Sequence, residues 1–185
     1  GARSWLEPLS ERRQQELREA MDTVVRILGA SEIVLEEADP RGESAARCLE
    51  RLGRELDERF ESGFDFARTA SASPEEVSPP AGCFLLARAP GGPVGCGALK
   101  VHRSERFGEI KRMWVSPEVR GLGVGRRLLE ALEDRARRAK LPVVRLSTNR
   151  ALGEAQALYR ASGYHEIPLF DVEPYAHLAF EKALK

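Results

Sequence analysis

The stretch EIKRMWVSPEVRGLGVGRRLLEALE, residues 109–133, decides the fold. It opens as a strand that runs to Val115 and closes as a helix with leucines at helical spacing. Between the two, Gly121, Gly123 and Gly125 let the backbone turn its N–H groups onto an anion, and the dipole of the following helix adds positive potential. The stretch therefore predicts a phosphate-binding loop between a strand and a helix.

Two common phosphate loops do not fit this pattern. A nucleotide P-loop ends in Gly-Lys-Ser/Thr, whereas Gly125 is followed by Arg126 and Arg127. A dinucleotide-binding loop has the spacing G-x-G-x-x-G, whereas these glycines alternate with single residues. Another phosphate ligand and an ordinary glycine-rich turn remain as alternatives.

The loop resembles the coenzyme A signature of the GNAT superfamily, Arg/Gln-x-x-Gly-x-Gly/Ala, which Arg120, Gly123 and Gly125 match. Residues 109–133 resemble the family's fourth strand, loop and long helix, and ALYRASGY at 157–164 resembles its Leu-Tyr-x-x-x-Gly-Tyr/Phe segment. The resemblance covers residues 31–185. It implies an N-acetyltransferase that uses acetyl-CoA as cosubstrate, without a metal, to acetylate the amine of a small molecule or peptide by direct attack in a ternary complex.

The implied fold is the GNAT fold of the α/β (α+β) class, with a central mixed, mostly antiparallel twisted sheet. About six or seven strands are flanked by about four helices, and an extra helix precedes them. The residue pattern predicts strands at 31–38, 83–87, 94–102, 108–115, 143–148 and 176–180, and helices at 42–59, 126–140 and 152–162. Residues 1–30 are predicted to be a helical appendage and residues 31–185 the acetyltransferase domain.

The appendage has a helical pattern over residues 9–28, with an apolar face formed by Leu17, Met21, Val24, Val25 and Leu28. This face must pack on the main domain, on a second copy, or on something absent. The segment resembles the tail of a MarR-type winged-helix regulator, which implies a MarR–GNAT fusion with an upstream DNA-binding domain and a homodimer through this helix. The alternative function is an acyl-CoA sensor without turnover that informs such a regulator.

Composition limits the partners and the compartment. The 29 basic residues balance the 29 acidic ones, so no overall field attracts nucleic acid or an anionic membrane. Three cysteines lack metal-ligand spacing and leave one thiol over in any disulfide scheme, which suits a reducing compartment. Neither a membrane-spanning run of about 20 apolar residues nor a signal-peptide core is present in the sequence. We expect a cytoplasmic protein without direct nucleic-acid or membrane contact.

The resemblance assigns coenzyme A to one group of residues. The backbone of Met113 and Val115 would pair with the pantetheine arm, and an N–H near them, freed by a strand bulge, would stabilise the oxyanion. The pyrophosphate would bind Arg120, Gly121, Leu122, Gly123, Val124 and Gly125. Asn149 joins this group less well, because the family's asparagine aligns with Leu152.

Two residues are candidates for proton transfer. Tyr159 matches a family tyrosine beside the coenzyme A sulfur, where it can protonate or hydrogen-bond the thiolate, or else it is a half-buried aromatic residue. Glu109 occupies a position where some family members place a general base. Its alternatives are a strand carboxylate paired with Lys111, or a water chain to bulk solvent that replaces the base.

The acceptor side is predicted from strand alternation, which places Ile110, Arg112 and Trp114 on the side opposite Glu109, Lys111, Met113 and Val115. If Arg112 faces the acceptor cleft, it can hold a substrate carboxylate bidentately and favour an amino acid or related small amine; otherwise it forms a surface ion pair. An apolar wall of the acceptor site or ordinary core is predicted for Phe64, Phe66, Trp114 and residues 168–177. The three histidines, His102, His165 and His177, are expected to be structural.

Overall fold

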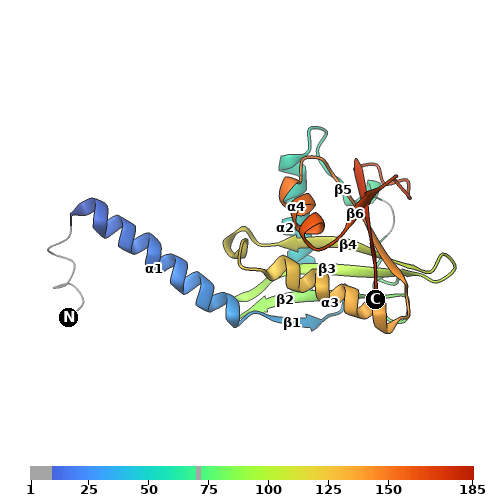
Figure 1. Cartoon of the computed structure of the whole chain (residues 1–185), viewed down its shortest axis with the longest axis horizontal. Helices are drawn as coiled ribbons and strands as arrows, with labels where there is room; N and C mark the ends of the chain where they lie inside the picture. The colour runs from blue at the N-terminus through green and yellow to red at the C-terminus, as the bar shows by residue number, and fades with distance from the viewer. Residues whose placement is uncertain (1–9, 70–71) are drawn as a thin grey trace.

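The computed structural model describes residues 10–69 and 72–185. In this part of the chain seven strands form one sheet in the order β1-β2-β3-β4-β5-β7-β6 (Figure 1). Neighbouring strands are antiparallel except β4 and β5, which are parallel. The strands are β1 (Val34–Glu37), β2 (Gly82–Ala89), β3 (Gly92–His102), β4 (Phe107–Val115), β5 (Val143–Thr148), β6 (His165–Ile167) and β7 (Leu178–Ala183). The predicted mixed, mostly antiparallel sheet is thus confirmed.

The described residues form four α-helices, of which α3 and α2 cover opposite faces of the sheet. They are α1 (Glu11–Ser31), α2 (Glu43–Arg59), α3 (Val124–Arg138) and α4 (Gly153–Ala161). On one face of the sheet, the leucines of α3 pack with Leu85 and Leu99 of the strands. On the other face, Cys48 and Leu52 of α2 pack with Phe84. The alternation of Phe84 and Leu85 between two cores is the period of two that defines a strand buried on both sides. Both helices are amphipathic, as their sequence spacing predicts.

The observed elements differ from the predicted ranges by a few residues at most ends; for example, α1 continues to Ser31, β1 begins at Val34 and β7 spans Leu178–Ala183. Strand β6 was not predicted, because it has only three residues and two of them are exposed. Helix α3 begins two residues before the predicted start, with Gly123 as its N-cap. Residue 9, the predicted start of the N-terminal helix, lies outside the described residues, and α1 begins at Glu11.

Strands β4 and β5 separate soon after they meet. Their parallel pairing covers only Phe107, Gly108 and Glu109 of β4, opposite residues 143–145 of β5. From Ile110 onward, β4 has no partner strand on this side. The sheet therefore opens into two halves that diverge from the paired ends of these strands.

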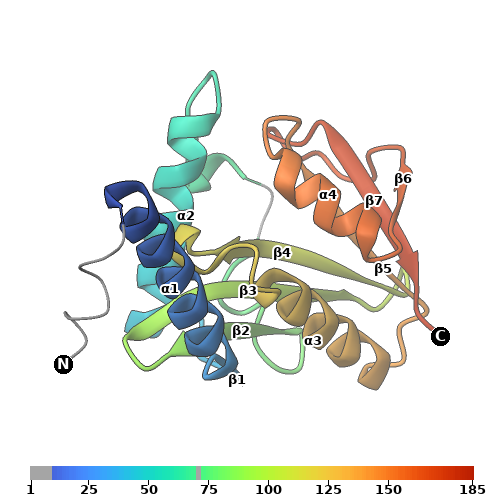
Figure 2. The ribbon, with the colours of Figure 1, turned by 60° about the vertical axis from the view of Figure 1, so that its left-hand side comes forward.

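Helix α1 projects away from the sheet and contacts it only near its C-terminal end (Figures 1 and 2). There Ala30 joins the core on the α3 face, and Arg127 of α3 donates from Nη1 to the carbonyl oxygen of Ala30 at 3.5 Å. The predicted apolar face stays exposed, with Val25 at 66% and Leu28 at 63%. Of the three predicted partners, the main domain is therefore excluded for most of this face. No helix in the described part of the chain is both long and apolar enough to cross a membrane.

Candidate active site

A cavity of about 520 Å³ lies between the separated strands. It is lined by α2, the segment after it, β4, the glycine loop, the end of β5, α4 and residues 173–176. Its size is within the range of small-molecule and cofactor sites. One end contains the glycine loop and Tyr159, and the other contains aromatic side chains with Arg112 and Glu173.

The glycine loop has the backbone that its sequence predicts. Gly121 and Gly123 have φ values of 77° and 80°, which only glycine adopts at little cost. A Cβ atom at either position would meet no atom within 4 Å, so open space lies beside the loop. Gly123 caps α3, whose first-turn N–H groups have no partner within the helix. All the predicted loop residues line the cavity except Leu122, which packs against the core on the α3 face.

Arg120 of the signature braces the loop from within the protein. Its Nε donates to the carbonyl oxygen of Val115 at 2.9 Å, and its Nη2 donates to Glu55 Oε2 at 2.5 Å. The same Glu55 oxygen accepts from Trp114 Nε1 at 2.9 Å. Burial raises the pKa of Glu55, but hydrogen bonds from Arg120 and Trp114 outweigh it and bring that pKa below its ordinary value. No sequence motif indicated Glu55, which lies on α2, far along the chain from the loop.

A second brace crosses from α2 to α4. Arg59 Nη2 donates to the carbonyl oxygen of Ala151 at 2.8 Å and to Glu154 Oε2 at 2.8 Å. Arg59 Nη1 also bonds Glu55 at 3.2 Å. These contacts join the two halves of the opened sheet on either side of the cavity.

Strand β4 contains the expected bulge. The β3–β4 register shifts between Cys96 and Ala98, so that Arg112 and Met113 together lie opposite Gly97. Arg112 has a φ of 58°, in the left-handed region, and its carbonyl oxygen accepts from the Cys96 thiol at 3.3 Å. A Cβ on Gly97 would lie 2.7 Å from Met113 Sδ, so the glycine makes room for the bulged strand. Bulges commonly re-aim backbone groups beside active sites.

The bulge overturns the predicted alternation in β4. Ile110 belongs to the core on the α3 face, whereas Trp114 belongs to the core on the α2 face. The prediction that these two residues share a side with Arg112 is therefore wrong, because one extra residue reverses the pleat. Met113 and Val115 pack against the α3 face and line the cavity with the unpaired edge of β4.

Tyr159 on α4 lines the cavity with only 5% of its surface exposed. Its ring packs against Tyr164 and Phe180, with centroids 6.0 and 5.9 Å away. Burial raises the pKa of Tyr159 to about 12, so the phenol keeps its proton throughout the neutral range. The protonated phenol can therefore act as a hydrogen-bond donor at the cavity.

Asn149 lines the cavity, and its side chain hydrogen-bonds to the backbone of two neighbouring segments. Its Nδ2 donates to the carbonyl oxygen of Tyr175 at 2.8 Å, and its Oδ1 accepts from the Ala151 N–H at 2.9 Å. The coenzyme A contact assigned to Asn149 stays a prediction.

Aromatic rings close the acceptor end of the cavity. Phe64 packs against Phe60, Phe66 and Tyr175 with centroid distances of 5.8, 4.7 and 4.9 Å. All four rings line the cavity. Tyr175 belongs to the stretch 168–177, for which the sequence predicts an apolar wall or ordinary core, and it reaches the cavity through its place before β7.

Arg112 supplies positive charge at the same end. Its guanidinium lies 4.2 Å above the Phe66 ring, and Nη2 is 3.4 Å from Thr69 Oγ1. Burial lowers the pKa of Arg112, partly offset by the charge of Glu173. Arginine still stays charged at neutral pH because its ordinary pKa is so high. Arg112 thus faces the cavity, which was one of the two alternatives for this residue.

Glu109 lies behind the cavity wall and is not among the described residues that line it. Its carboxylate accepts from Lys111 Nζ and His102 Nε2, both at 2.8 Å. Burial raises the pKa of Glu109, but Lys111 and His102 outweigh it and bring that pKa below its ordinary value. The carboxylate at the acceptor end belongs to Glu173, which the sequence did not reveal. The geometry therefore does not support direct contact between Glu109 and a substrate.

No three His, Cys, Asp or Glu side chains in the described ranges come together in a way that could hold a metal ion. Polar side chains that line the cavity include those of Tyr159, Arg112, Lys111 and Glu173.

We expect Gly123→Ala to weaken acetyl-CoA binding roughly tenfold, because a Cβ at a φ of 80° costs about 1–2 kcal/mol and shifts the loop. Calorimetric titration of acetyl-CoA measures this change. Gly91→Ala is the matched control, since a Cβ there also meets no atom within 4 Å but no left-handed backbone is involved. Equal affinity of the Gly123 variant and the wild type would contradict the assignment of the loop.

Comparisons with known proteins agree with this geometry. The model of the acetyltransferase (GNAT) family matches residues 49–164. The IAA acetyltransferase of Azospirillum brasilense is 47% identical over 81 residues, covering 44% of this chain and 53% of the relative. The aminoalkylphosphonate N-acetyltransferase of Salmonella typhimurium is 33% identical over 84 residues, covering 45% and 49%. The chain spans about half the length of these curated relatives.

Solved structures resemble the whole domain. A protein from Klebsiella pneumoniae, described as an acyl-CoA N-acyltransferase, has a TM-score of 0.67 at 28% identity, covering 83% of this chain and 98% of its own. A phosphinothricin acetyltransferase from Sinorhizobium meliloti, solved with AcCoA, has a TM-score of 0.57 at 19% identity, covering 83% and 89%, and shows likeness of fold alone. The family match covers more than half of the residues, and the chain belongs to the acetyltransferase (GNAT) family, whose members use acetyl-CoA.

Proposed function

We propose that the chain transfers the acetyl group of acetyl-CoA to the primary amine of a small molecule that also carries an anionic group. One observation carries the proposal: a single cavity joins the glycine loop and Tyr159 to an acceptor end with its own aromatic and charged side chains. Both substrates can therefore occupy the site together, as direct attack in a ternary complex requires.

The donor half of the reaction follows from the loop, the edge of β4 and Tyr159. The N–H groups of Gly121 to Gly125 bind the pyrophosphate, while the unpaired backbone of Met113 and Val115 binds the pantetheine arm. A backbone N–H at the bulge stabilises the oxyanion formed when the amine attacks the thioester carbon. Because the pKa of Tyr159 is about 12, its phenol acts chiefly as a hydrogen-bond donor to the departing thiolate.

The acceptor half selects the amine. The guanidinium of Arg112 has five N–H donors, of which one reaches Thr69, and it faces the cavity. Such a group can bind a carboxylate, phosphonate or phosphate bidentately. The name of the Salmonella relative points to an amine that carries a phosphonate, which belongs to this chemical class. Amino acids and aminoalkylphosphonates are therefore the first acceptors to try.

A sensor that binds acyl-CoA without turnover explains the site less well. Such a protein needs only the coenzyme A half of the cavity. The acceptor half, with four aromatic rings, Arg112 and Glu173, has no use in that reading.

Tyr159→Phe is expected to lower kcat at least tenfold while acetyl-CoA affinity changes little, because the ring and its packing remain and only the donor is lost. Thiol release from acetyl-CoA with a panel of amino acids, aminoalkylphosphonates, polyamines, aminoglycosides and short peptides measures turnover. Tyr164→Phe is the control for loss of a buried phenol. The Tyr164 hydroxyl donates to Glu133 at 3.1 Å, and Tyr164 is not among the residues that line the cavity. Acetyl-CoA binding without turnover on any amine would favour the sensor.

Arg112→Met is expected to raise KM for anionic amines about tenfold or more, because the paired anion loses a charged hydrogen-bond partner. KM for an uncharged analogue, such as the amide of the same amino acid, should change little. The ratio of the two effects is the measurement. A similar loss for both substrates would show that Arg112 only maintains the fold of the bulge.

We further propose that α1 pairs two copies of the chain. Leu17, Met21, Val24 and Leu28 alternate at spacings of four and three, the seam of a coiled coil, and all four are exposed. A second copy presents the same spacing, and α1 extends away from the sheet so that another helix can approach it (Figure 1). Attachment to an upstream MarR-type domain and a cytoplasmic location stay predictions; the three buried free thiols are compatible with a reducing compartment.

Light scattering tests the pairing. The wild type is expected to be dimeric at micromolar concentration, and Val24→Glu with Leu28→Glu is expected to be monomeric because charge enters the seam. Thr23→Glu, on an exposed position outside the seam, should leave the dimer intact. A wild-type chain that is monomeric at every concentration would refute the pairing.

A further inference from the structure

The interior of α2 contains a glycine that the helix itself does not need. Gly53 lies well inside the helix, which runs from Glu43 to Arg59, and its φ is not in the left-handed region. Glycine is less favourable than alanine inside a helix, because it loses more backbone freedom on folding. The reason for a glycine at this position therefore lies in what packs against it.

The ring of Phe66 occupies the space that a side chain at position 53 would take. A Cβ atom on Gly53 would lie 2.8 Å from Phe66 Cε2, 3.5 Å from Cδ2 and 3.8 Å from Cζ. These three atoms are the nearest to that position, whereas carbon atoms in favourable contact are about 3.5–4.0 Å apart. An alanine at position 53 would therefore push the ring away from α2.

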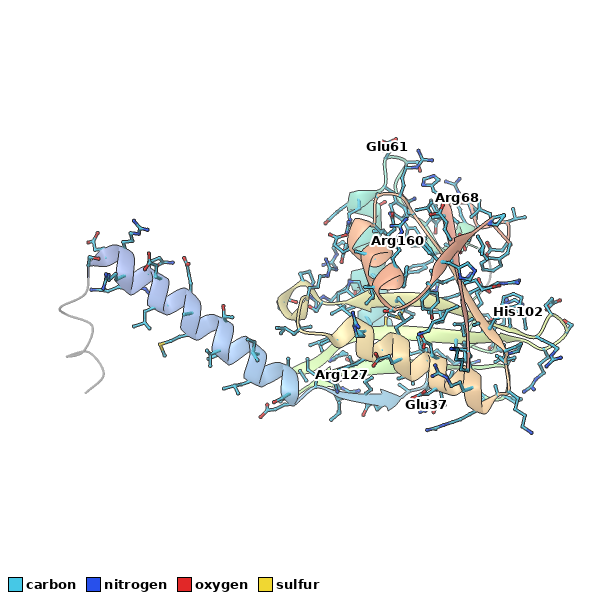
Figure 3. All side chains as sticks on the ribbon, viewed as in Figure 1. Glu37, Glu61, Arg68, His102, Arg127 and Arg160 are labelled. Carbon is cyan, nitrogen blue, oxygen red and sulfur yellow. The ribbon has the colours of Figure 1, made fainter. Side chains whose placement is uncertain are left out.

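The same ring supports the guanidinium of Arg112. The guanidinium carbon lies 4.2 Å from the centroid of the Phe66 ring, which is close enough for a cation–π contact. The Thr69 hydroxyl donates to the carbonyl oxygen of Phe66 at 2.8 Å and accepts from Arg112 Nη2 at 3.4 Å. Ring and hydroxyl both belong to the turn η2 (Phe66–Arg68) and its C-cap, so the place of η2 sets the place of the guanidinium. Figure 3 labels Arg68, the last residue of η2, in the upper part of the domain.

Two hydrogen bonds hold the backbone that leads into η2. The N–H of Phe64 donates to Asp57 Oδ1 at 2.9 Å, and the N–H of Asp65 donates to the Tyr175 hydroxyl at 3.1 Å. Both bonds act on the backbone ahead of Phe66, and neither sets the distance between its ring and α2. That distance is limited by the ring's own contact with the helix.

We propose that Gly53 is a positioning residue for acceptor binding: because it has no side chain, Phe66 lies against α2 and holds the guanidinium of Arg112 in place for the anionic group of the amine. The inference rests on the proposed acetyl transfer to an anionic amine and adds the residue that places the anion-binding group. Gly53 is not among the described residues that line the cavity, so it acts through Phe66.

The geometry of anion binding sets the size of the effect. A guanidinium binds a carboxylate or phosphonate bidentately only while two of its N–H groups are aligned with two oxygens. A misplacement of about 1 Å at a positioning group can cost about a hundredfold in rate. Relief of the contact at position 53, from 2.8 Å to about 3.5 Å, needs a shift of about 0.7 Å. We therefore expect a partial loss of acceptor binding in an alanine variant.

The kinetics of Gly53→Ala test the positioning. KM for the anionic amine is expected to rise about fivefold, because the guanidinium loses its alignment. kcat at saturating amine, KM for the amide of the same amine and the affinity for acetyl-CoA should each change less than twofold. Gly29→Ala is the matched control, since it also replaces a glycine inside a helix and its Cβ meets no atom within 4 Å. It should leave all of these constants unchanged.

A second change at Phe66 tests whether Gly53 acts through the ring. Leucine lacks the Cε2 and Cζ atoms of phenylalanine, so a Cβ at position 53 fits beside it. Phe66→Leu alone should raise KM for the anionic amine, because the guanidinium loses the ring beneath it. Adding Gly53→Ala to Phe66→Leu should then change KM less than twofold, since two residues that act through one contact are not additive. A further fivefold loss in the double variant would overturn the inference.

Thermal melting tests the same contact without turnover. Added to Phe66→Leu, Gly53→Ala is expected to raise Tm, because alanine favours the helix. In the wild type the same change should raise Tm less or lower it, because the ring must move. Equal shifts of Tm in the two backgrounds would overturn the contact.

The kinetic outcomes separate this inference from the proposed function. An active wild type with an equal KM in Gly53→Ala overturns the inference alone. The same holds for a Gly53→Ala variant that loses the amide and the anionic amine alike, because the change then disturbs more than Arg112. A wild type that acetylates no amine overturns the proposed function together with the inference.

Discussion

The parallel ladder between β4 and β5 stops after three residue pairs, and the site depends on this early end. Backbone groups of β4 beyond Glu109 are left for a ligand, because no neighbouring strand takes them. The same divergence gives room for the cavity, into which α4 brings Tyr159 from one half and the glycine loop comes from the other. A sheet paired along its whole length would have no place for either substrate.

An opened sheet needs bonds that hold its halves at a fixed distance. Arg59 of α2 provides them by reaching Ala151 and Glu154 of the other half. Arg120 joins the glycine loop to β4 and to Glu55 of α2 within one half. These ion pairs are partly buried. Exposed ion pairs add little to the free energy of folding, and in buried pairs the desolvation cost offsets the attraction, so the main role of these contacts is to fix geometry. Their effect is to position the loop and α4 for the chemistry.

The sequence predicted the local features of this site better than its long-range ones. The glycine loop and α3 follow from residues close in the chain, where the left-handed backbone at Gly121 and Gly123 and the leucine period leave few alternatives. The bulge at Arg112 depends on its register with β3, which alternation within β4 alone does not reveal. Glu173 reaches the cavity through the loop that precedes β7, far along the chain from the acceptor wall, and no motif marks it.

Arg112 is the extra residue of β4, and this has an evolutionary consequence. Neither core includes its side chain among the buried groups that fill it, since Ile110 and Trp114 on either side supply that packing. Substitution at this one position can therefore change the charge that meets the acceptor without repacking the domain. If the proposed function holds, the bulge separates the residues that keep the fold from the residue that selects the substrate, so that specificity can change while the proposed coenzyme A half stays the same.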